Sequence, residues 1–552
     1  MNPSLVRTVA VPTFGGLALL LTVASANAET PPVCGPGTAP LTLTGLVTPQ
    51  QKQTYRLLPF AVLEGTGRVE VGYRWTDRPG LPSTPLTATT LDLGLWDEDG
   101  TRGVRAFRGW GGSRQGRLDL GQPPVFVQAD AADRGFTPGR VKPGLWHVEI
   151  GIAAVAPQGA DYEVQIACKA ALGSKPAADR VDPHHVARFE PGWYHGDFHM
   201  HAYHSNPRGP DDVAFVAQAR AAQLDFLMVT EYVTGRHWDT LGMAQRLNPD
   251  LVIWPGREII TYFGHMNTHG ETPSVLEYRH GFEDIRAGEI QRRAKADGAL
   301  FQVNHPTLFP GPLFANFCRG CEFRLDRAID WHLVDTMEIL TGPVLATADD
   351  LGVALPLGTL SIEQPFMATA IALWERRLRE GYKITAVSGS DSKGVEGTPE
   401  ERARKGYGSS ATAVYADELS RPALTRAIQA GHAYVRTRGV AASPALVFEA
   451  TTADGQRGIF GDTLEVEAGE NVELRTTVTG GAGQVLTVLR NGAIVLSVPI
   501  TTDPFVHTFK RARRVPWSEG PLGTFWRVET RDPKSRTAIG NPVFLRAPAG
   551  SD

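Results

Sequence analysis

The spacing of apolar residues changes twice along this chain of 552 residues, and that change limits the folds it can adopt. From about residue 29 to residue 170, apolar and polar residues alternate, as at Val69, Val71 and Tyr73. A period of two, interrupted by Gly and Pro turns, is typical of antiparallel strands with one buried face. The sequence therefore predicts an N-terminal β-sandwich domain over residues 29–180.

The middle of the chain has a different pattern, in which short apolar runs alternate with amphipathic helices. Helices are expected over residues 211–224 and 365–380, and strands over residues 225–229, 251–254, 299–303 and 384–387. Repeated alternation of strands and helices indicates an α/β domain with a parallel sheet or a barrel. We assign this domain to residues 181–437.

After about Val440 the period returns to two. Asn491-Gly492 lies between two apolar pairs, which is a strong hairpin signal. A second β-sandwich domain is therefore expected over residues 438–552. Hydrophobic residues make up 42% of the chain and charged residues 21%, a balance that excludes bulk disorder.

The N-terminus has the layout of a signal peptide. Arg7 precedes an apolar stretch over residues 14–24, and Ala26-Asn27-Ala28 forms a cleavage site of small residues. We predict that residues 1–28 are removed and that the protein is exported to the periplasm or secreted. No later segment has 18 uncharged apolar residues in succession, so no membrane span is expected. The net charge of −4 argues against a general nucleic-acid binder.

Export bears on the four cysteines. Cys34 and Cys168 bracket the first β domain and are expected to form a disulfide bond. Cys318 and Cys321 could bind a metal or act in redox chemistry, but in an exported protein we favour a local disulfide bond.

The histidines are concentrated in one part of the chain. Eleven of the 15 fall between His184 and His305, and several follow strand-like runs. In α/β barrels the carboxyl ends of the strands converge, and active sites are built there. Histidine and carboxylate side chains at that mouth are suitable ligands for Zn²⁺, Mn²⁺ or Fe²⁺.

Five motifs follow one another in this region: residues 196–201 (Gly-Asp-Phe-His-Met-His), 227–232 (Leu-Met-Val-Thr-Glu-Tyr), 255–258 with 264–267, 304–306 (Asn-His-Pro) and 389–393 (Gly-Ser-Asp-Ser-Lys). In this order they resemble the PHP (polymerase and histidinol phosphatase) family of metal-dependent phosphoesterases. Details such as Asn304-His305-Pro306 with a downstream Cys-x-x-Cys are similar to the carbaryl-hydrolase-like (CehA/McbA) branch. The resemblance covers roughly residues 192–438.

The resemblance implies a distorted (β/α)₇ barrel whose mouth holds divalent metal ions. A first ion would be held by His199, His201, Glu258 and Asp391. A second ion would share Glu258 and add His265 and His305. The nucleophile would then be a hydroxide that bridges two ions, so no protein nucleophile is required.

The sequence also departs from the family pattern. The positions that usually bind a third metal read Asn206, Tyr232 and Lys393. We therefore expect two ions, with the Lys393 ammonium supplying positive charge and pairing with Glu231 or with a substrate oxygen. Together with His237, which could line the pocket, Lys393 and Glu231 are the candidate catalytic residues.

These features predict a metal-dependent hydrolase of a small-molecule ester, first of all a phosphomonoester or phosphodiester. The same site could instead hydrolyse a carboxyl ester or a carbamate, because a metal-activated water attacks a carbonyl equally well. A third hypothesis is an exported binding module with a degenerate metal site. The β-sandwich domains by themselves indicate no function.

Overall fold

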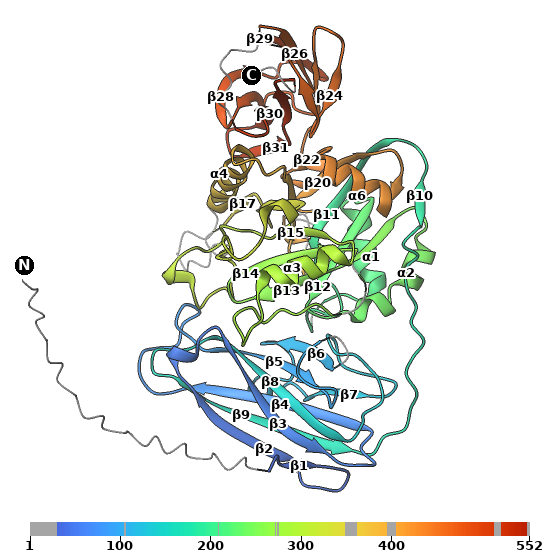
Figure 1. Ribbon diagram of the computed structural model, residues 1–552, viewed down its shortest axis with the longest axis vertical. Helices are drawn as coiled ribbons and strands as arrows, with labels where there is room; N and C mark the ends of the chain where they lie inside the picture. Colours follow the sequence, from blue (N-terminus) through green and yellow to red (C-terminus); the bar gives the residue numbers. More distant parts are fainter. Residues whose placement is uncertain are drawn as a thin grey trace, which may run out of the picture.

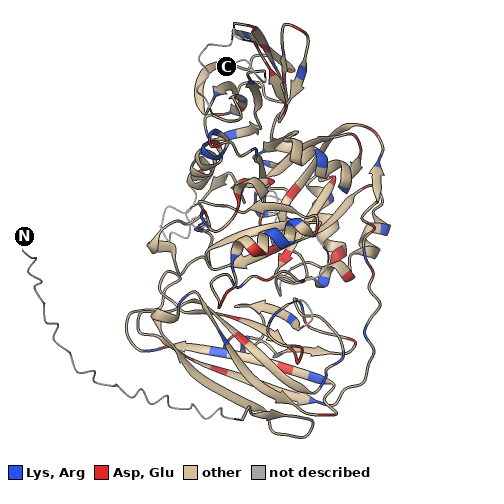
Figure 2. Cartoon of the chain, in the orientation of Figure 1, with Lys and Arg blue, Asp and Glu red and all other residues tan. Residues whose placement is uncertain are grey.

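The computed structural model describes residues 30–103, 106–207, 209–270, 272, 275–347, 361–394, 404–467, 469–512 and 520–548. The fold is mixed α/β with many strands and few helices, in three parts that follow one another along the long axis (Figure 1). The predicted signal peptide lies outside the described residues. Among the described residues, no helix combines the length and apolar character that crossing a membrane requires. Acidic and basic residues are interspersed in each part (Figure 2).

The N-terminal part consists of two sheets packed face to face, antiparallel except for the parallel pair β1–β3. One sheet has the order β1 (Val33–Cys34), β3 (Thr54–Val62), β8 (Gly144–Ala154), β5 (Thr90–Trp96) and β6 (Phe107–Gly112); the other has the order β2 (Leu41–Val47), β9 (Ala160–Lys169), β4 (Arg68–Asp77) and β7 (Val125–Gln128). Val69, Val71 and Tyr73 are buried between the sheets, as their alternation predicts. Cys34 and Cys168 are disulfide-bonded with Cα atoms 5.6 Å apart, as predicted.

The central part is built on one curved sheet. Its order is β19 (Thr385–Gly389), β16 (Thr336–Thr341), β15 (Leu300–Val303), β14 (Gly264–His269), β13 (Val252–Thr261), β12 (Phe226–Tyr232), β11 (Gly192–Met200), β20 (Ala411–Ala416) and β22 (Ala433–Arg436). The pairs β11–β12, β12–β13, β15–β16 and β16–β19 are parallel, whereas β14 is antiparallel to both of its neighbours.

A closed barrel is not confirmed. β19 stands at one end of the hydrogen-bonded order, and an isolated bridge between Met200 and Ser392 brings it to β11. Ser388 of β19 also donates its backbone N–H to the Thr412 hydroxyl of β20, at 2.9 Å. The sheet therefore curls until its two sides meet, but the described residues form no second ladder there.

The helices are α1 (Asp212–Ala221), α2 (Gly242–Leu247), α3 (Ala287–Ala296), α4 (Pro365–Arg379), α6 (Arg421–Ala430) and α7 (Gly439–Ala442). Short strand pairs are added by β10 (Val186–Arg188) with β21 (Leu419–Ser420), and by β17 (Leu345–Ala346) with β18 (Ile362–Glu363).

Both predicted helices form, as α1 and α4. Asp211 caps α1 by accepting from Ala214 N–H, and Pro365 at the start of α4 needs no hydrogen-bond partner there.

The C-terminal part continues the central sheet. The order runs on from β22 to β31 (Arg536–Gly540), β30 (Thr524–Arg531), β27 (Val485–Arg490) and β28 (Ala493–Pro499), with β32 (Val543–Arg546) and β25 (Thr463–Glu465) to the side. A second sheet has the order β24 (Arg457–Ile459), β23 (Ala445–Thr451), β26 (Asn471–Thr479) and β29 (Phe505–Ala512). The predicted hairpin is confirmed: Asn491 and Gly492, both with positive φ, connect β27 to β28.

Candidate metal centre

The carboxyl ends of the parallel strands bring the predicted ligands together. His199 is the penultimate residue of β11, and His201 follows that strand. His305 and Asp391 come just after β15 and β19, respectively. Both residues have positive φ, 24° and 48°, a conformation that costs energy for residues other than Gly and is concentrated at functional sites. Glu258 on β13 and His265 on the neighbouring β14 complete the group.

Four of these residues form one compact set. Ligand atoms of His199, His201, Glu258 and Asp391 all lie within 4.8 Å of one another. The Nε2 atoms of His199 and His201 are each 3.3 Å from Glu258 Oε2. His201 Nε2 is also 2.9 Å from Asp391 Oδ1. This is the set predicted for the first ion.

The remaining two histidines approach the other oxygen of Glu258. His265 Nδ1 lies 3.1 Å from Glu258 Oε1, and His305 Nε2 lies 3.7 Å from it. The rings of His265 and His305 have centroids 5.2 Å apart. One carboxylate therefore faces two pairs of histidines, which is the arrangement expected of a shared ligand.

In each histidine, the ring nitrogen farther from Glu258 pairs with the surrounding protein. His201 Nδ1 lies 3.1 Å from the Ser205 hydroxyl, His265 Nε2 lies 2.9 Å from the Arg319 carbonyl, and His305 Nδ1 lies 3.3 Å from the Cys321 carbonyl. Hydrogen bonds of this kind fix the ring orientation and the tautomer of metal-binding histidines. The other ring nitrogen of each histidine therefore faces the carboxylate of Glu258.

Glu338 is a site residue that the sequence reasoning missed. This carboxylate on β16 is fully buried, lies 3.3 Å from His199 Nδ1 and accepts from the His305 backbone N–H at 2.9 Å. It thus orients one histidine of each pair. Its sequence signal is an acidic residue in the interior of an apolar strand, Thr336–Thr341.

The electrostatics of the cluster fit a cation. Burial by itself lowers the pKa of His199, but Glu258, Glu338 and Asp391 outweigh burial and raise that pKa well above its usual range. Burial raises the pKa of Glu258, whereas His199 and the hydrogen bonds from the other histidines hold it well below its usual range. His199 Nε2 is buried without a hydrogen-bond partner, although it points toward two carboxylates. A divalent ion at this position would satisfy that nitrogen and balance the carboxylate charge.

The candidate catalytic residues are placed differently from the ligands. Lys393 Nζ donates to Asp391 Oδ1 at 2.5 Å, so the expected pair with Glu231 is not formed. The Glu231 carboxylate instead accepts from the backbone N–H groups of Ala202 and His204, at 3.2 and 2.9 Å. That buried carboxylate holds the loop after β11. If Glu231 paired with Lys393 instead, these two backbone N–H groups would lose their hydrogen-bond acceptor.

His237 and two of the third-metal positions, Tyr232 and Asn206, lie around this loop. His237 is buried with its Nε2 2.7 Å from the Gly256 carbonyl, and its ring is 6.5 Å from that of His204. Tyr232 packs its ring 4.1 Å from the His201 ring. The carbonyl of Asn206 accepts from Arg134 of the N-terminal part. Among the described residues, neither His237 nor His204 belongs to a group of His, Cys, Asp and Glu whose ligand atoms converge as those of the quartet do.

The second cysteine pair adjoins the site without supplying a ligand. Cys321 lies within 4.8 Å of ligand atoms of His265 and His305, but its sulfur is bonded to Cys318, as the disulfide prediction stated. The loop between the two cysteines instead offers the Arg319 carbonyl to His265.

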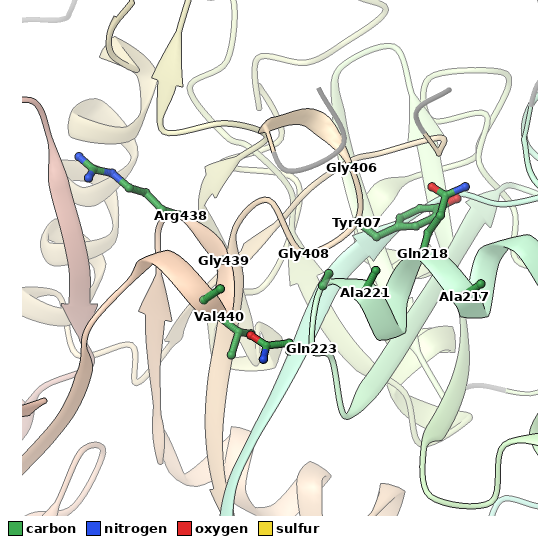
Figure 3. Close-up of a pocket in the computed structure, with 12 residues that line it drawn as sticks. Ala217, Gln218, Ala221, Gln223, Gly406, Tyr407, Gly408, Arg438, Gly439 and Val440 are labelled. Carbon is green, nitrogen blue, oxygen red and sulfur yellow. The ribbon is translucent and has the colours of Figure 1, made fainter. Parts of the chain in front are cut away.

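A cavity of about 460 Å³ lies between α1, residues 406–408 and α7 (Figure 3). The Tyr407 side chain lines this cavity and donates its hydroxyl to the His201 carbonyl at 2.6 Å. Its described lining contains no His, Asp or Glu, so it offers no metal ligands of the kind found in the cluster.

Comparison with known proteins gives distant likenesses among solved structures. No protein-family model and no curated protein matches the chain. Among solved structures, it is similar to a two-domain protein from Bacteroides vulgatus ATCC 8482 described as containing a predicted PHP-like metal-dependent phosphoesterase. The two are 15% identical, the match covers 66% of this chain and 99% of that one, and the TM-score is 0.33. A likeness at this level assigns the chain to no family branch, so the chemistry of the site rests on its own side chains.

Proposed function

We propose that this protein is an exported metal-dependent hydrolase of phosphoesters. The observation that carries the proposal is the buried quartet of His199, His201, Glu258 and Asp391, in which a His199 nitrogen with no hydrogen-bond partner faces two carboxylates. Buried charges and polar atoms are costly unless they are paired or bind a metal. The six predicted ligands offer nitrogen and oxygen donors for two ions that share Glu258, and Zn²⁺, Mn²⁺ and Fe²⁺ all suit such donors.

Two such ions, held by these six residues, would supply an acidified water and positive charge opposite a phosphoryl group. The chain's own residues set the geometry. Glu338, Ser205 and two loop carbonyls orient the histidines, and Lys393 places an ammonium group beside Asp391. The side chains of Lys393 and Asp391 are 25% and 29% exposed, whereas those of His199 and His201 are fully buried. The open side of the site is therefore the side on which Lys393 lies.

The two disulfide bonds support the export part of the proposal, because such bonds persist in oxidising compartments. Several further assignments stay predictions: the signal peptide, the carbaryl-hydrolase-like branch, the (β/α)₇ barrel and the three domain boundaries.

The proposal is tested by elemental analysis of the purified full chain together with hydrolysis of three substrates. These are p-nitrophenyl phosphate, bis(p-nitrophenyl) phosphate and p-nitrophenyl acetate. We expect up to two divalent ions per chain and faster turnover of a phosphoester than of the acetate. Turnover of the acetate alone would identify a carboxyl-ester hydrolase, and bound metal without any turnover would identify a binding module. Both results contradict the proposal.

A further inference from the structure

The N-terminal part reaches the candidate metal centre at the loop between the two bonded cysteines. Arg319 lies in this loop, and its Nη1 is 2.6 Å from Asp92 Oδ1 and 3.2 Å from the Ser113 hydroxyl. Asp92 lies on β5 of the N-terminal part and is fully buried. The carbonyl of Arg319 meanwhile accepts from His265. One residue therefore links the N-terminal domain to a predicted metal ligand.

The Arg319 guanidinium is held in one position by tight packing. Tyr262 donates to the second oxygen of Asp92 at 2.9 Å, so both oxygens of that carboxylate are engaged. Gly112, at the end of β6, has a φ of 53°, and a Cβ atom there would lie 2.8 Å from the Trp110 ring and 3.4 Å from Arg319 Nη1. A side chain at this point would therefore collide with the Trp110 ring that neighbours the guanidinium. The Trp110 ring lies 5.9 Å from it.

The same guanidinium neighbours the candidate metal centre through Trp110 and Tyr232. Its charge acts on the Tyr232 phenol, whose ring packs on His201 and lies 5.5 Å from Lys393 Nζ. Trp110 contacts Tyr232 edge-on at 5.9 Å. The Arg319 side chain is 20% exposed and Lys393 is 25% exposed. Two cations therefore flank Tyr232 at the accessible edge of the cluster.

Only part of the hydrogen-bonding capacity of Arg319 is used. Among the described residues, the partners of its side chain are Asp92 and Ser113, and both bind Nη1. The Nε and Nη2 groups keep their donors for a ligand. A guanidinium presents donors in a planar fork that matches the oxygens of a phosphate or a carboxylate.

We infer that Arg319, clamped by Asp92 of the N-terminal domain, binds the anionic group of the substrate, so that this domain completes the active site. The inference rests on the proposed function and deepens it, because it assigns the substrate class as anionic. An anion that meets Arg319 and Lys393 would approach the metal cluster from its open side. A neutral ester would gain nothing from Arg319.

The test measures binding of inorganic phosphate to the metal-loaded full chain by isothermal titration calorimetry, for the wild type and for Arg319→Gln. Loss of a charge-assisted hydrogen bond should weaken phosphate binding about 10- to 100-fold. The KM for p-nitrophenyl phosphate should rise by a similar factor, while the KM for p-nitrophenyl acetate and the metal content stay unchanged. Arg527→Gln is the matched control, because Arg527 is also an arginine paired with a buried carboxylate, that of Glu375, 2.7 Å away. It should leave phosphate binding unaltered.

Two results would overturn the inference directly: no phosphate binding by the wild type, or equal losses of phosphate affinity in Arg319→Gln and Arg527→Gln. Loss of metal from Arg319→Gln would also overturn it, because Arg319 would then act only through His265. If Arg319→Gln does not fold, Arg319→Lys keeps one cation for Asp92 but loses the fork, and it must still weaken phosphate binding for the inference to stand. If the wild type binds metal and phosphate but hydrolyses no ester, the proposed function fails while the anion site stands.

Discussion

The N-terminal and C-terminal β regions share a hydrophobic period of two, yet they are attached to the central sheet in different ways. The C-terminal region joins through backbone hydrogen bonds, because β31 pairs with β22. The N-terminal region pairs no strand with the central sheet in the described residues; it docks through side chains such as Tyr262 on Asp92 and Tyr278 on Glu149.

The two attachments also meet different parts of the central sheet. The N-terminal region contacts the loops after the strands: Arg134 binds the carbonyls of Asn206 and Gly209, and Asp92 binds Arg319. In the C-terminal region, Asn541 binds Ala386 near the start of β19, five residues before Asp391. Elements of the same class can therefore extend a scaffold or shape a site, and the difference lies in which ends of the strands they touch.

A mutation in the metal cluster itself gives the effect against which mutations in the two β regions can be compared. His201→Ala removes a nitrogen donor between Glu258 and Asp391, and we expect activity to fall by roughly 10³-fold, the scale of losing a group that stabilises the transition state. Metal content, measured by elemental analysis, should fall with it. Both β regions should keep their thermal unfolding transitions, because neither contacts the His201 side chain in the described residues. Wild-type turnover in a folded variant would show that the site is misassigned.

The two attachments can be compared directly with Asp92→Asn and Glu375→Gln. Each change breaks a buried carboxylate–arginine pair that crosses between parts of the chain, at 2.6 Å for Arg319 and 2.7 Å for Arg527. Loss of one partner of a buried pair costs about 3–5 kcal/mol in the free energy of unfolding, so urea unfolding should show similar destabilisation in both.

Their effects on activity should differ. Asp92→Asn releases Arg319 beside the cluster and should raise the KM for p-nitrophenyl phosphate, whereas Glu375→Gln should leave that KM unchanged. If both variants alter the KM equally, the contrast between the two β regions is wrong.

Much of the fold was predictable because its signals are local. The alternation of apolar and polar residues predicted the strands of the N-terminal part. Asp211 and Pro365 indicated the starts of helices, and Asn491-Gly492 indicated a hairpin. The candidate ligands came from the resemblance of short motifs to those of a known family, and the structure places each of them in, or just after, a strand.

The rest depends on contacts between distant segments. The β22–β31 pairing joins residues about a hundred positions apart, and nothing in either strand specifies the partner. The Asp92–Arg319 pair spans 227 positions. Glu338 gave a weak local signal, an acid in an apolar strand, but only the fold shows that it lies beside His199.

Lys393→Met should have a smaller effect, and a selective one. The ammonium lies on Asp391 at the open side, so its removal should lower kcat/KM for p-nitrophenyl phosphate about tenfold, about 1.4 kcal/mol, and change p-nitrophenyl acetate turnover less. Parallel losses on both substrates would mean that Lys393 only supports Asp391.

Elemental analysis of the wild type should give no more than two metal ions per chain, because the fixed ammonium of Lys393 repels a third cation. Three ions per chain would contradict this prediction.

The smallest effect concerns His204, which lies in the loop after β11 that Arg134 of the N-terminal region contacts. Burial lowers the pKa of this imidazole to about 3, and Arg236 and Arg134 lower it further in the same direction. Between that value and about 6.5, the unfolded chain binds a proton that the folded chain does not. Stability from this group is therefore present at neutral pH and is lost as the pH falls below about 6.5, at up to about 1.4 kcal/mol per pH unit.

His204→Gln removes this titration and should make the free energy of unfolding less dependent on pH between 6.5 and 4.5, as measured by urea unfolding at several pH values. Arg134→Gln, which removes the charge contributed by the N-terminal region, should reduce the same slope by a smaller amount. His185→Gln, on an exposed segment, is the matched control. An identical slope in the wild type, His204→Gln and Arg134→Gln would show that the N-terminal region has no electrostatic influence on this loop, and the contrast with the C-terminal region would then rest on the Asp92–Arg319 pair alone.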